Sequence, residues 1–379
     1  ELMRVLLTGG GTAGHINPAL AIADIVRRNA PGSEIAFVGI RGGKEEDLVP
    51  REGYALHYVR SMGIRRSLSP ANIKACWMAL TSPYSRQTTG ILDAFRPDIV
   101  IGTGGYACWP IMAAAVRRKI PTALHESNAL PGLAVRKLQK KVDRIWINFA
   151  RTAELLRVHD SVVQVGNPLR GGFGVISREE ARKRLGLRAG QTCILSFGGS
   201  LGAEHVNLAV LDLMQRLSGA RPDCVFWHAS GKRDYETTLA GFRSRGLEKA
   251  AGCTLTDYIY DMPLRMAAAD LVISRAGAMT LSELARMNKA CILIPSPYVA
   301  DNHQYHNAKA MADDGAAVLI EESALPGGAL IDAVEALLSD AEQRRSMESA
   351  IGAFAGPDAN RRIWEQILEL TAGRKPQEI

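Results

Sequence analysis

The chain has 379 residues, 47% of them hydrophobic, which is enough for two domains that each bury a full core. Six cysteines are scattered without a CxxC pair, which argues against a disulfide or zinc framework and is typical of reduced, buried thiols in a cytosolic protein. No run of about 18 apolar residues is present to span a bilayer, and the first residues form a core strand rather than a signal peptide. The net charge of +7 favours anionic partners, whether nucleotides, nucleic acid or a membrane surface.

The first half of the chain alternates short apolar strands with helices. Helical stretches such as 18–29 and 110–118 separate the strands. Alternation of this kind predicts a parallel sheet with helices on both faces. The predicted strands are residues 4–8, 34–39, 98–102, 122–125, 144–148 and 162–165.

A segment rich in Gly and Pro, residues 166–175, interrupts this pattern and is predicted to link two domains. The sequence therefore predicts an α/β protein with two Rossmann-like, doubly wound domains, residues 1–165 and 166–338. The helical region 339–379 is expected to pack back on the first domain. The predicted strands of the second domain are residues 193–197, 224–229, 253–255, 271–274, 291–294 and 318–320.

Four predicted strands run into a glycine-containing turn and then a helix, two in each domain. Such turns expose the unpaired N–H groups of a helix N-terminus, and glycine lets a phosphate approach them closely. Two turns in each domain suggest two anionic ligands. The segments are RVLLTGGGTAGHINPAL, DIVIGTGGYACWP, CILSFGGSLGAEHVN and LVISRAGAMTLSE.

The first of these turns fits two common nucleotide-binding motifs incompletely. Gly9, Gly11 and Gly14 satisfy GxGxxG, but the second strand ends without the acidic residue that would hold the ribose of NAD. His15 and Ile16 stand where a P-loop has Lys and Ser or Thr, so the sequence disfavours a P-loop ATPase as it disfavours NAD binding.

Candidate catalytic groups follow the strands of the first domain. His15 begins a helix whose dipole favours a neutral ring, so it is either a proton acceptor or a residue that ties the loop by hydrogen bonds. Tyr106, Glu126 and Asn128 follow neighbouring strands and are expected at the same edge of the sheet. Glu126 is either one of these functional groups or a carboxylate that caps the next helix.

In the second domain, the turn at residues 198–203 suits a diphosphate. Glu283 lies inside the helix after the fourth turn, where it is either a ribose ligand or a surface acid. The amide-rich run at residues 297–308 suits the hydroxyl groups of a sugar. No His-x-x-x-His or Asp-x-Asp pair with metal-ligand character stands out, so no metal site is predicted.

Apolar residues amid basic ones mark a further segment of the first domain. Ile73 and Trp77 form either the core face of an amphipathic helix or a patch that faces an anionic membrane. Lys140 belongs to a basic run farther along the chain.

Taken together, the motifs resemble those of the MurG family of peripheral glycosyltransferases, and they occur in that family's order along nearly the whole chain. This resemblance implies a GT-B fold, in which two Rossmann-like domains face each other across a cleft. It further implies inverting transfer of N-acetylglucosamine from UDP-GlcNAc to the 4-hydroxyl of the muramoyl sugar of lipid I, which gives lipid II in peptidoglycan synthesis, without a cofactor. The motifs are GGGTAGHINPALA, GTGGYACWP, HESNALPG, GNPLR, GGSLGA, DYIYDM, ADLVISRAGAMTLSE and DNHQYHNA.

The resemblance also implies roles for individual residues. His15, Glu126 and Tyr106 would be catalytic, with His15 the first choice of base and Glu126 the second. Gly10, Gly11, Gly104 and Gly105 would hold the acceptor diphosphate, and Ile73, Trp77 and Lys140 would meet the membrane. The donor would be bound by Thr12, Ala13, Gly14, Asn128, Arg170, Ser200, Ile259, Ala278, Met279, Thr280, Leu281, Ser282, Glu283 and Gln304.

The implied partners are UDP-GlcNAc, lipid I, the anionic cytoplasmic membrane surface and proteins of cell-wall synthesis, but not nucleic acid. Three positions depart from the family pattern, because Cys108 stands for a usual Ser and both Ser127 and Leu201 stand for a usual Gln. Two rival functions are a UDP-GlcNAc 2-epimerase of the same fold and a non-catalytic UDP-sugar-binding protein. The second glycine turn argues against the epimerase. His15 argues against the non-catalytic binding protein, which would have no use for it.

Overall fold

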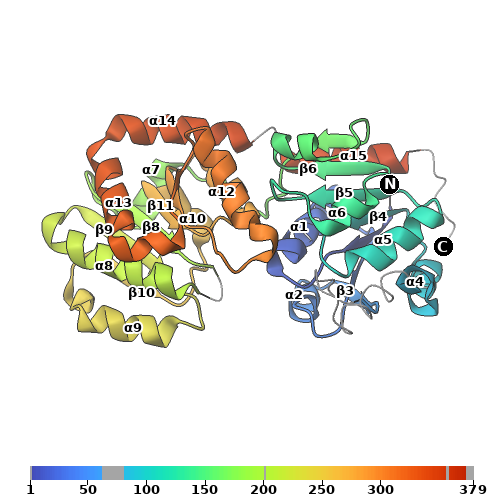
Figure 1. The fold of residues 1–379 in the computed structure, drawn as a ribbon, viewed down its shortest axis with the longest axis horizontal. Helices are drawn as coiled ribbons and strands as arrows, with labels where there is room; N and C mark the ends of the chain where they lie inside the picture. The colour runs from blue at the N-terminus through green and yellow to red at the C-terminus, as the bar shows by residue number, and fades with distance from the viewer. Residues whose placement is uncertain (1, 62–80, 200–201, 356–357, 373–379) are drawn as a thin grey trace. The chain divides into compact units, whose positions relative to one another are not determined.

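The computed structural model describes residues 2–61, 81–199, 202–355 and 358–372, and it divides into two compact units (Figure 1). Unit 1 comprises Glu1–Arg170 together with Gly356–Ile379, and unit 2 comprises Gly171–Ala355. The chain thus enters unit 2 a few residues after the predicted boundary at 165. No helix in the described part of the chain is both long and apolar enough to cross a membrane.

Unit 1 is built on a seven-stranded parallel sheet with the order β3-β2-β1-β4-β5-β6-β7. The edge strand β3 was not predicted, because its sequence ALHY is only partly buried and lacks the continuous apolar run of the central strands. The strands are β1 (Arg4–Thr8), β2 (Glu34–Gly39), β3 (Ala55–Tyr58), β4 (Ile99–Gly102), β5 (Thr122–Glu126), β6 (Arg144–Ile147) and β7 (Val162–Gln164).

Side chains of alternate strand residues fill two separate cores, one on each face of this sheet. In β1, Val5 and Leu7 join the core under α1 and α15, whereas Leu6 joins the core under α4, α5 and α6. This is the two-residue period of a strand that is buried on both faces. The helices are α1 (Ala13–Asn29), α2 (Glu45–Arg51), α4 (Arg86–Phe95), α5 (Cys108–Arg117), α6 (Leu133–Leu138) and α15 (Ala359–Thr371).

The C-terminal helical region is shared between the two units. Helix α15 buries Ile363 and Ile367 in a core of unit 1, beside α1 (Figure 1). Helix α14 (Ala341–Gly352) packs instead on α11 and α13 of unit 2, where Met347 lies against the N–H of Cys291. Only the last of these helices therefore returns to the first unit.

Unit 2 repeats the architecture with a six-stranded parallel sheet in the order β10-β9-β8-β11-β12-β13. The strands are β8 (Thr192–Phe197), β9 (Cys224–Ala229), β10 (Cys253–Thr256), β11 (Leu271–Ser274), β12 (Cys291–Leu293) and β13 (Val318–Leu319). The remaining helices are α7 (Arg178–Arg184), α8 (Glu204–Ala220), α9 (Tyr235–Ser244), α10 (Met262–Ala268), α11 (Ala278–Arg286), α12 (His303–Asp313) and α13 (Ala329–Ser339).

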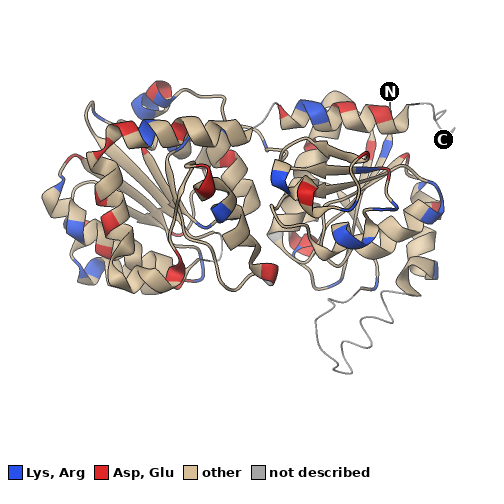
Figure 2. Cartoon of the chain, turned by 45° about the horizontal axis from the view of Figure 1, so that its top comes forward, with Lys and Arg blue, Asp and Glu red and all other residues tan. Residues whose placement is uncertain are grey.

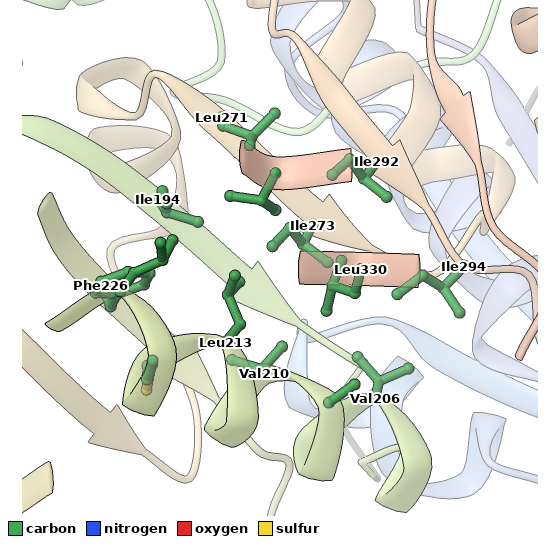
Figure 3. Close-up of a cluster of buried hydrophobic side chains, with 14 of the residues drawn as sticks. Ile194, Val206, Val210, Leu213, Phe226, Leu271, Ile273, Ile292, Ile294 and Leu330 are labelled. Atoms are coloured by element: carbon green, nitrogen blue, oxygen red, sulfur yellow. The ribbon is translucent and has the colours of Figure 1, made fainter. Parts of the chain in front are cut away.

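The core of unit 2 shows how one face of its sheet is covered. Ile194, Phe226 and Ile273 of the sheet meet Val210 and Leu213 of α8 (Figure 3). Charged residues lie mainly on the surrounding helices and loops (Figure 2). The prediction of two doubly wound, Rossmann-like domains is confirmed, and in each unit the carboxyl ends of the parallel strands place their loops at one edge of the sheet.

Candidate active site

Two glycine loops of unit 1 interlock at the carboxyl edge of its sheet. The N–H of Gly10 donates to the carbonyl of Gly104 over 3.3 Å. Gly105 has a φ of +82°, and a Cβ there would lie 2.0 Å from the carbonyl oxygen of Gly10. A Cβ on Gly104 would lie 2.7 Å from His15 Nδ1. Only glycine fits these two positions, because the neighbouring loop and the imidazole ring occupy the space of a side chain.

A buried carboxylate, Glu45 at the start of α2, supports the first of these loops. Its Oε2 accepts from the N–H of Gly11 (3.0 Å) and its Oε1 from the N–H of Ile40 (2.9 Å). A Cβ on Gly10 would lie 2.4 Å from Glu45 Oε1. The N–H groups of Gly10 and Gly11, which were predicted to hold a diphosphate, therefore already donate within the protein. The first turn of α1 still leaves the N–H groups of Ala13 and Gly14 without a partner in the helix.

His15 sits in that first turn with a defined tautomer. Its Nδ1 lies 3.1 Å from the carbonyl oxygen of Thr103. A carbonyl can only accept, so Nδ1 carries the hydrogen and the neutral ring has its lone pair on Nε2. The hydroxyl of Thr103 donates in turn to the carbonyl of His15 over 2.6 Å. The ring thus ties the loop to Thr103 through Nδ1.

Glu126 ends β5 as a buried carboxylate with three donors around it. It accepts from the N–H of Asn128 (3.0 Å), the side-chain amide of Asn128 (3.2 Å) and the N–H of Gly132 (2.7 Å). Burial raises the pKa of Glu126, and these hydrogen bonds oppose that rise. Since Gly132 is the N-cap residue of α6, Glu126 holds the turn that leads into this helix, and whether it also acts in catalysis stays a prediction.

Tyr106 and Arg170, two other predicted site residues of unit 1, differ in their accessibility to a ligand. Tyr106 is 52% exposed, and its ring lies 3.8 Å from the position of a Cβ on Gly11. Arg170 contacts Glu52 (Nη1 to Oε1, 2.9 Å) and Asp24 (Nε to Oδ2, 3.3 Å), and these acids raise its pKa. The guanidinium of Arg170 is therefore engaged within unit 1, and its contact with the donor stays a prediction.

Unit 2 holds a cavity of about 600 Å³ at the carboxyl edge of its sheet. The glycine loop after β8, the start of α8 and the start of α11 form part of its wall. Whether this cavity holds a diphosphate stays a prediction. Gly199 and Gly202 in that loop have φ values of +101° and +104°. The lining residues are Phe197, Gly198, Gly199, Gly202, Ala203, Glu204, His205, Arg233, Arg275, Gly277, Thr280, Ser296, Tyr298, Gln304 and Glu322.

The predicted donor residues of α11 divide between the cavity and the interior. Thr280 lines the cavity, whereas Leu281 is fully buried and its N–H donates to the carbonyl of Gly277. The hydroxyl of Ser282 donates to the carbonyl of Ala278 over 3.2 Å. Helical geometry therefore directs only part of the predicted segment, residues 278–283, toward a ligand.

Glu283 lies one turn after Ala278, and no described residue donates a hydrogen bond to its carboxyl group. Burial raises its pKa from an ordinary value of 4.5 to about 8. The group is therefore largely protonated at neutral pH, and it lies on the helix whose first turn lines the cavity.

The other predicted positions are placed as follows. Gln304 lines the cavity and accepts from the N–H of Ser296 over 2.9 Å. Ile259 is buried in the loop after β10, between two exposed tyrosines. Lys140 is exposed after α6, and Met279 follows Ala278 in the first turn of α11. Ser200, Leu201, Ile73 and Trp77 lie outside the described residues.

Charged residues of the cavity wall were missed by the sequence analysis. Arg275 donates from Nη1 to the carbonyls of Ile294 and Pro295 (3.2 Å each) and from Nη2 to Glu322. Glu322 also meets His205 Nδ1 at 2.9 Å. Arg275 and Arg233 follow the ends of β11 and β9 closely. Their position after predicted strands could therefore have identified both from the sequence, as it did the glycine turns.

In the described part of the chain, no group of three or more His, Cys, Asp or Glu side chains is arranged to hold a metal ion.

Two doubly wound parallel-sheet units, with a cavity at the strand ends of one of them, define a two-domain Rossmann-like protein. The chain matches the glycosyltransferase family 28 N-terminal domain over residues 5–147 and the C-terminal domain of that family over residues 193–363, and it belongs to this family.

Among its relatives, the UDP-N-acetylglucosamine–N-acetylmuramyl-(pentapeptide) pyrophosphoryl-undecaprenol N-acetylglucosamine transferase of Acetivibrio thermocellus is 39% identical over 373 residues, covering 97% of this chain and 98% of the relative. The crystal structure of Acinetobacter baumannii MurG superposes with a TM-score of 0.76 at 24% identity, covering 96% of this chain and 99% of that one. A UDP-N-acetylglucosamine 2-epimerase shares only the fold, with a TM-score of 0.60 at 14% identity over 100% of this chain and 99% of that one.

Proposed function

We propose that this glycosyltransferase moves N-acetylglucosamine from UDP-GlcNAc to the 4-hydroxyl of the N-acetylmuramoyl sugar of lipid I, and so makes lipid II for peptidoglycan synthesis. The observation that carries the proposal is the cavity of unit 2, whose glycine loop and helix starts suit a nucleoside diphosphate, in a chain that matches transferases of this name over almost its full length.

The two units have different tasks in this proposal. Unit 2 binds the donor, with Thr280 and Gln304 at the cavity wall. Glu283, on the same helix as Thr280, is assigned to the ribose by the resemblance. Unit 1 binds the acceptor diphosphate through the first turn of α1 rather than through Gly10 and Gly11, whose N–H groups have protein acceptors. An exposed Tyr106 beside the glycine loop is placed to contact the acceptor.

The reaction inverts the anomeric centre and needs a base and a stabilised leaving group. His15 Nε2 takes the proton of the acceptor hydroxyl as its oxygen attacks C1 of the donor sugar. The bond from C1 to the diphosphate breaks at the same time, and UDP leaves with the electron pair. N–H groups at the starts of α8 and α11 stabilise the charge that develops on the diphosphate. Glu126 holds the turn that carries Asn128.

The protein acts on a lipid-linked acceptor, and we place it on the cytoplasmic face of the cell membrane. Exposed Leu133 and the basic residues Lys137, Lys140 and Lys141 lie on and just after α6, which suits an anionic surface. Ile73 and Trp77 of the predicted membrane patch lie outside the described residues, so their part in this contact rests on the resemblance alone.

The test is acceptor dependence. Purified protein is given UDP-GlcNAc with and without lipid I or a short-chain analogue, and UDP release and the glycan product are measured. Rapid UDP release only with acceptor, together with a β-1,4-linked disaccharide product, supports the proposal. Turnover without acceptor, or conversion of the donor to its 2-epimer, would refute it and favour the epimerase.

A further inference from the structure

We propose that Arg233 binds the diphosphate of the donor nucleotide, held in position by Asp234. This inference rests on the proposed function, because it assigns a further residue to the same donor site. Arg233 belongs to the loop after β9 and lines the cavity of unit 2 together with Gly199 and Gly202 of the glycine loop.

The guanidinium of Arg233 is oriented by a side-on ion pair. Its Nε lies 2.7 Å from Asp234 Oδ1 and its Nη2 lies 3.2 Å from Asp234 Oδ2. The Asp234 side chain is only 13% exposed, whereas that of Arg233 is 64% exposed. The pairing uses one edge of the guanidinium, and no described residue accepts from Nη1. Donors on the remaining edge are thus available to a phosphate oxygen.

Asp234 also joins this arginine to the glycine loop. Gly202 has a φ of +104°, and a Cβ there would lie 2.4 Å from Asp234 Oδ2 and 2.6 Å from the carbonyl oxygen of Ser230. The loop therefore packs directly on the carboxylate that orients Arg233. Guanidinium donors and the N–H groups at the start of α8 consequently face one cavity.

The second arginine of the cavity wall has a different role. Arg275 donates to two backbone carbonyls and to Glu322, and its side chain is only 12% exposed. Its charge is balanced by the buried Glu322, so it joins the ends of β11 and β12 to the 3₁₀ helix η5 (Glu322–Gly327). Both arginines are paired with a carboxylate, but Arg233 is the more accessible of the two, with donors left on its open edge. It therefore adds charge stabilisation where the leaving diphosphate gains negative charge.

The experiment compares the binding of UDP and of uridine to Arg233→Gln by calorimetry. Losing a charge-assisted contact with phosphate should weaken UDP binding about ten- to hundredfold, because such a bond contributes roughly 1.5 to 3 kcal/mol. Uridine binding should stay within about twofold, since uridine has no phosphate. Arg233→Lys should recover part of the UDP affinity, because it restores the charge without the planar fork.

The matched control is Arg243→Gln, which removes an arginine of α9 that is 63% exposed and pairs with Glu248 at 3.5 Å. It should leave both affinities unchanged. Unaltered UDP binding in Arg233→Gln, or equal weakening of UDP and uridine, would overturn the proposal, the second by showing a merely structural role. Neither binding measurement needs the acceptor. If the protein binds UDP but transfers nothing to lipid I, the proposed function is refuted and the role of Arg233 still stands. A wild-type protein that binds no UDP would overturn both.

Discussion

Replacing Glu283 by Gln should raise the free energy of unfolding at alkaline pH and lower the affinity for the donor nucleotide. The carboxyl group has no donor among the described residues, and burial raises its pKa from 4.5 to about 8. A carboxyl whose pKa is raised on folding binds more protons in the folded state than in the unfolded state. Its favourable contribution is therefore present below pH 4.5 and is lost as the pH rises through about 8.

The magnitude follows from the size of this shift. Each pKa unit corresponds to about 1.4 kcal/mol, so ionising the buried group above pH 8 costs at most about 5 kcal/mol. The side chain keeps some contact with solvent, which reduces the cost, and we expect Glu283→Gln to gain about 2 to 4 kcal/mol at pH 9. Below pH 4.5 the two proteins should differ little, because the acid and the amide are then both neutral.

The assay is urea unfolding of the wild type and of Glu283→Gln from pH 4 to pH 9, in the absence of nucleotide. Other buried groups also titrate, since burial lowers the pKa of His125 and His228 to about 4 and that of Lys289 to about 7. Subtracting the two stability curves cancels these contributions. A difference curve that stays flat from pH 4.5 to pH 8 would show that Glu283 does not ionise in a desolvated site, and the reasoning would be wrong.

His15→Gln should lower kcat by about a hundredfold or more and leave UDP affinity within about twofold, because the base acts only on the acceptor hydroxyl. Glu126→Gln should instead cost about 1 to 3 kcal/mol of stability, since an amide N–H₂ then faces a backbone donor, and should keep most of the turnover. The opposite pattern in this pair of variants would make Glu126 the base. Glu45→Ala should lower the free energy of unfolding by about 1 to 3 kcal/mol, because it leaves the N–H groups of the half-buried Gly11 and Ile40 without their acceptor. Denaturant unfolding measures this loss, and a change below about 1 kcal/mol would mean that water replaces the carboxylate.

The sequence was sufficient for the fold because the features that specify it are local. Apolar runs that alternate with helices predicted both parallel sheets, and the strand ends predicted where the glycine loops lie. The edge strand β3 was not predicted, because its sequence ALHY is half-buried and carries polar residues. Helix α14 was predicted to pack on the first domain, but it packs in unit 2. Its few buried residues, such as Met347, do not reveal from the sequence which core they enter.

The candidate site was predictable only as a set of loops. Which N–H groups are open to a ligand depends on side chains far away in sequence, as Glu45 shows by accepting from Gly11 across 34 positions. Arg170 was assigned to the donor by resemblance, yet its contact with Asp24 spans 146 positions and engages its guanidinium within unit 1.

By itself, therefore, the sequence determined the two sheets, the positions of their glycine loops and the family, because strand periodicity and helix starts are encoded within a few consecutive residues. Tertiary structure decided which charged groups face the cavity and which are neutralised. Arg233 and Arg275 look alike in sequence, but Asp234 orients the first toward the cavity and Glu322 balances the second in its wall. The reason is that a charge buried on folding must find its partner in space, and that choice has no periodic signature along the chain.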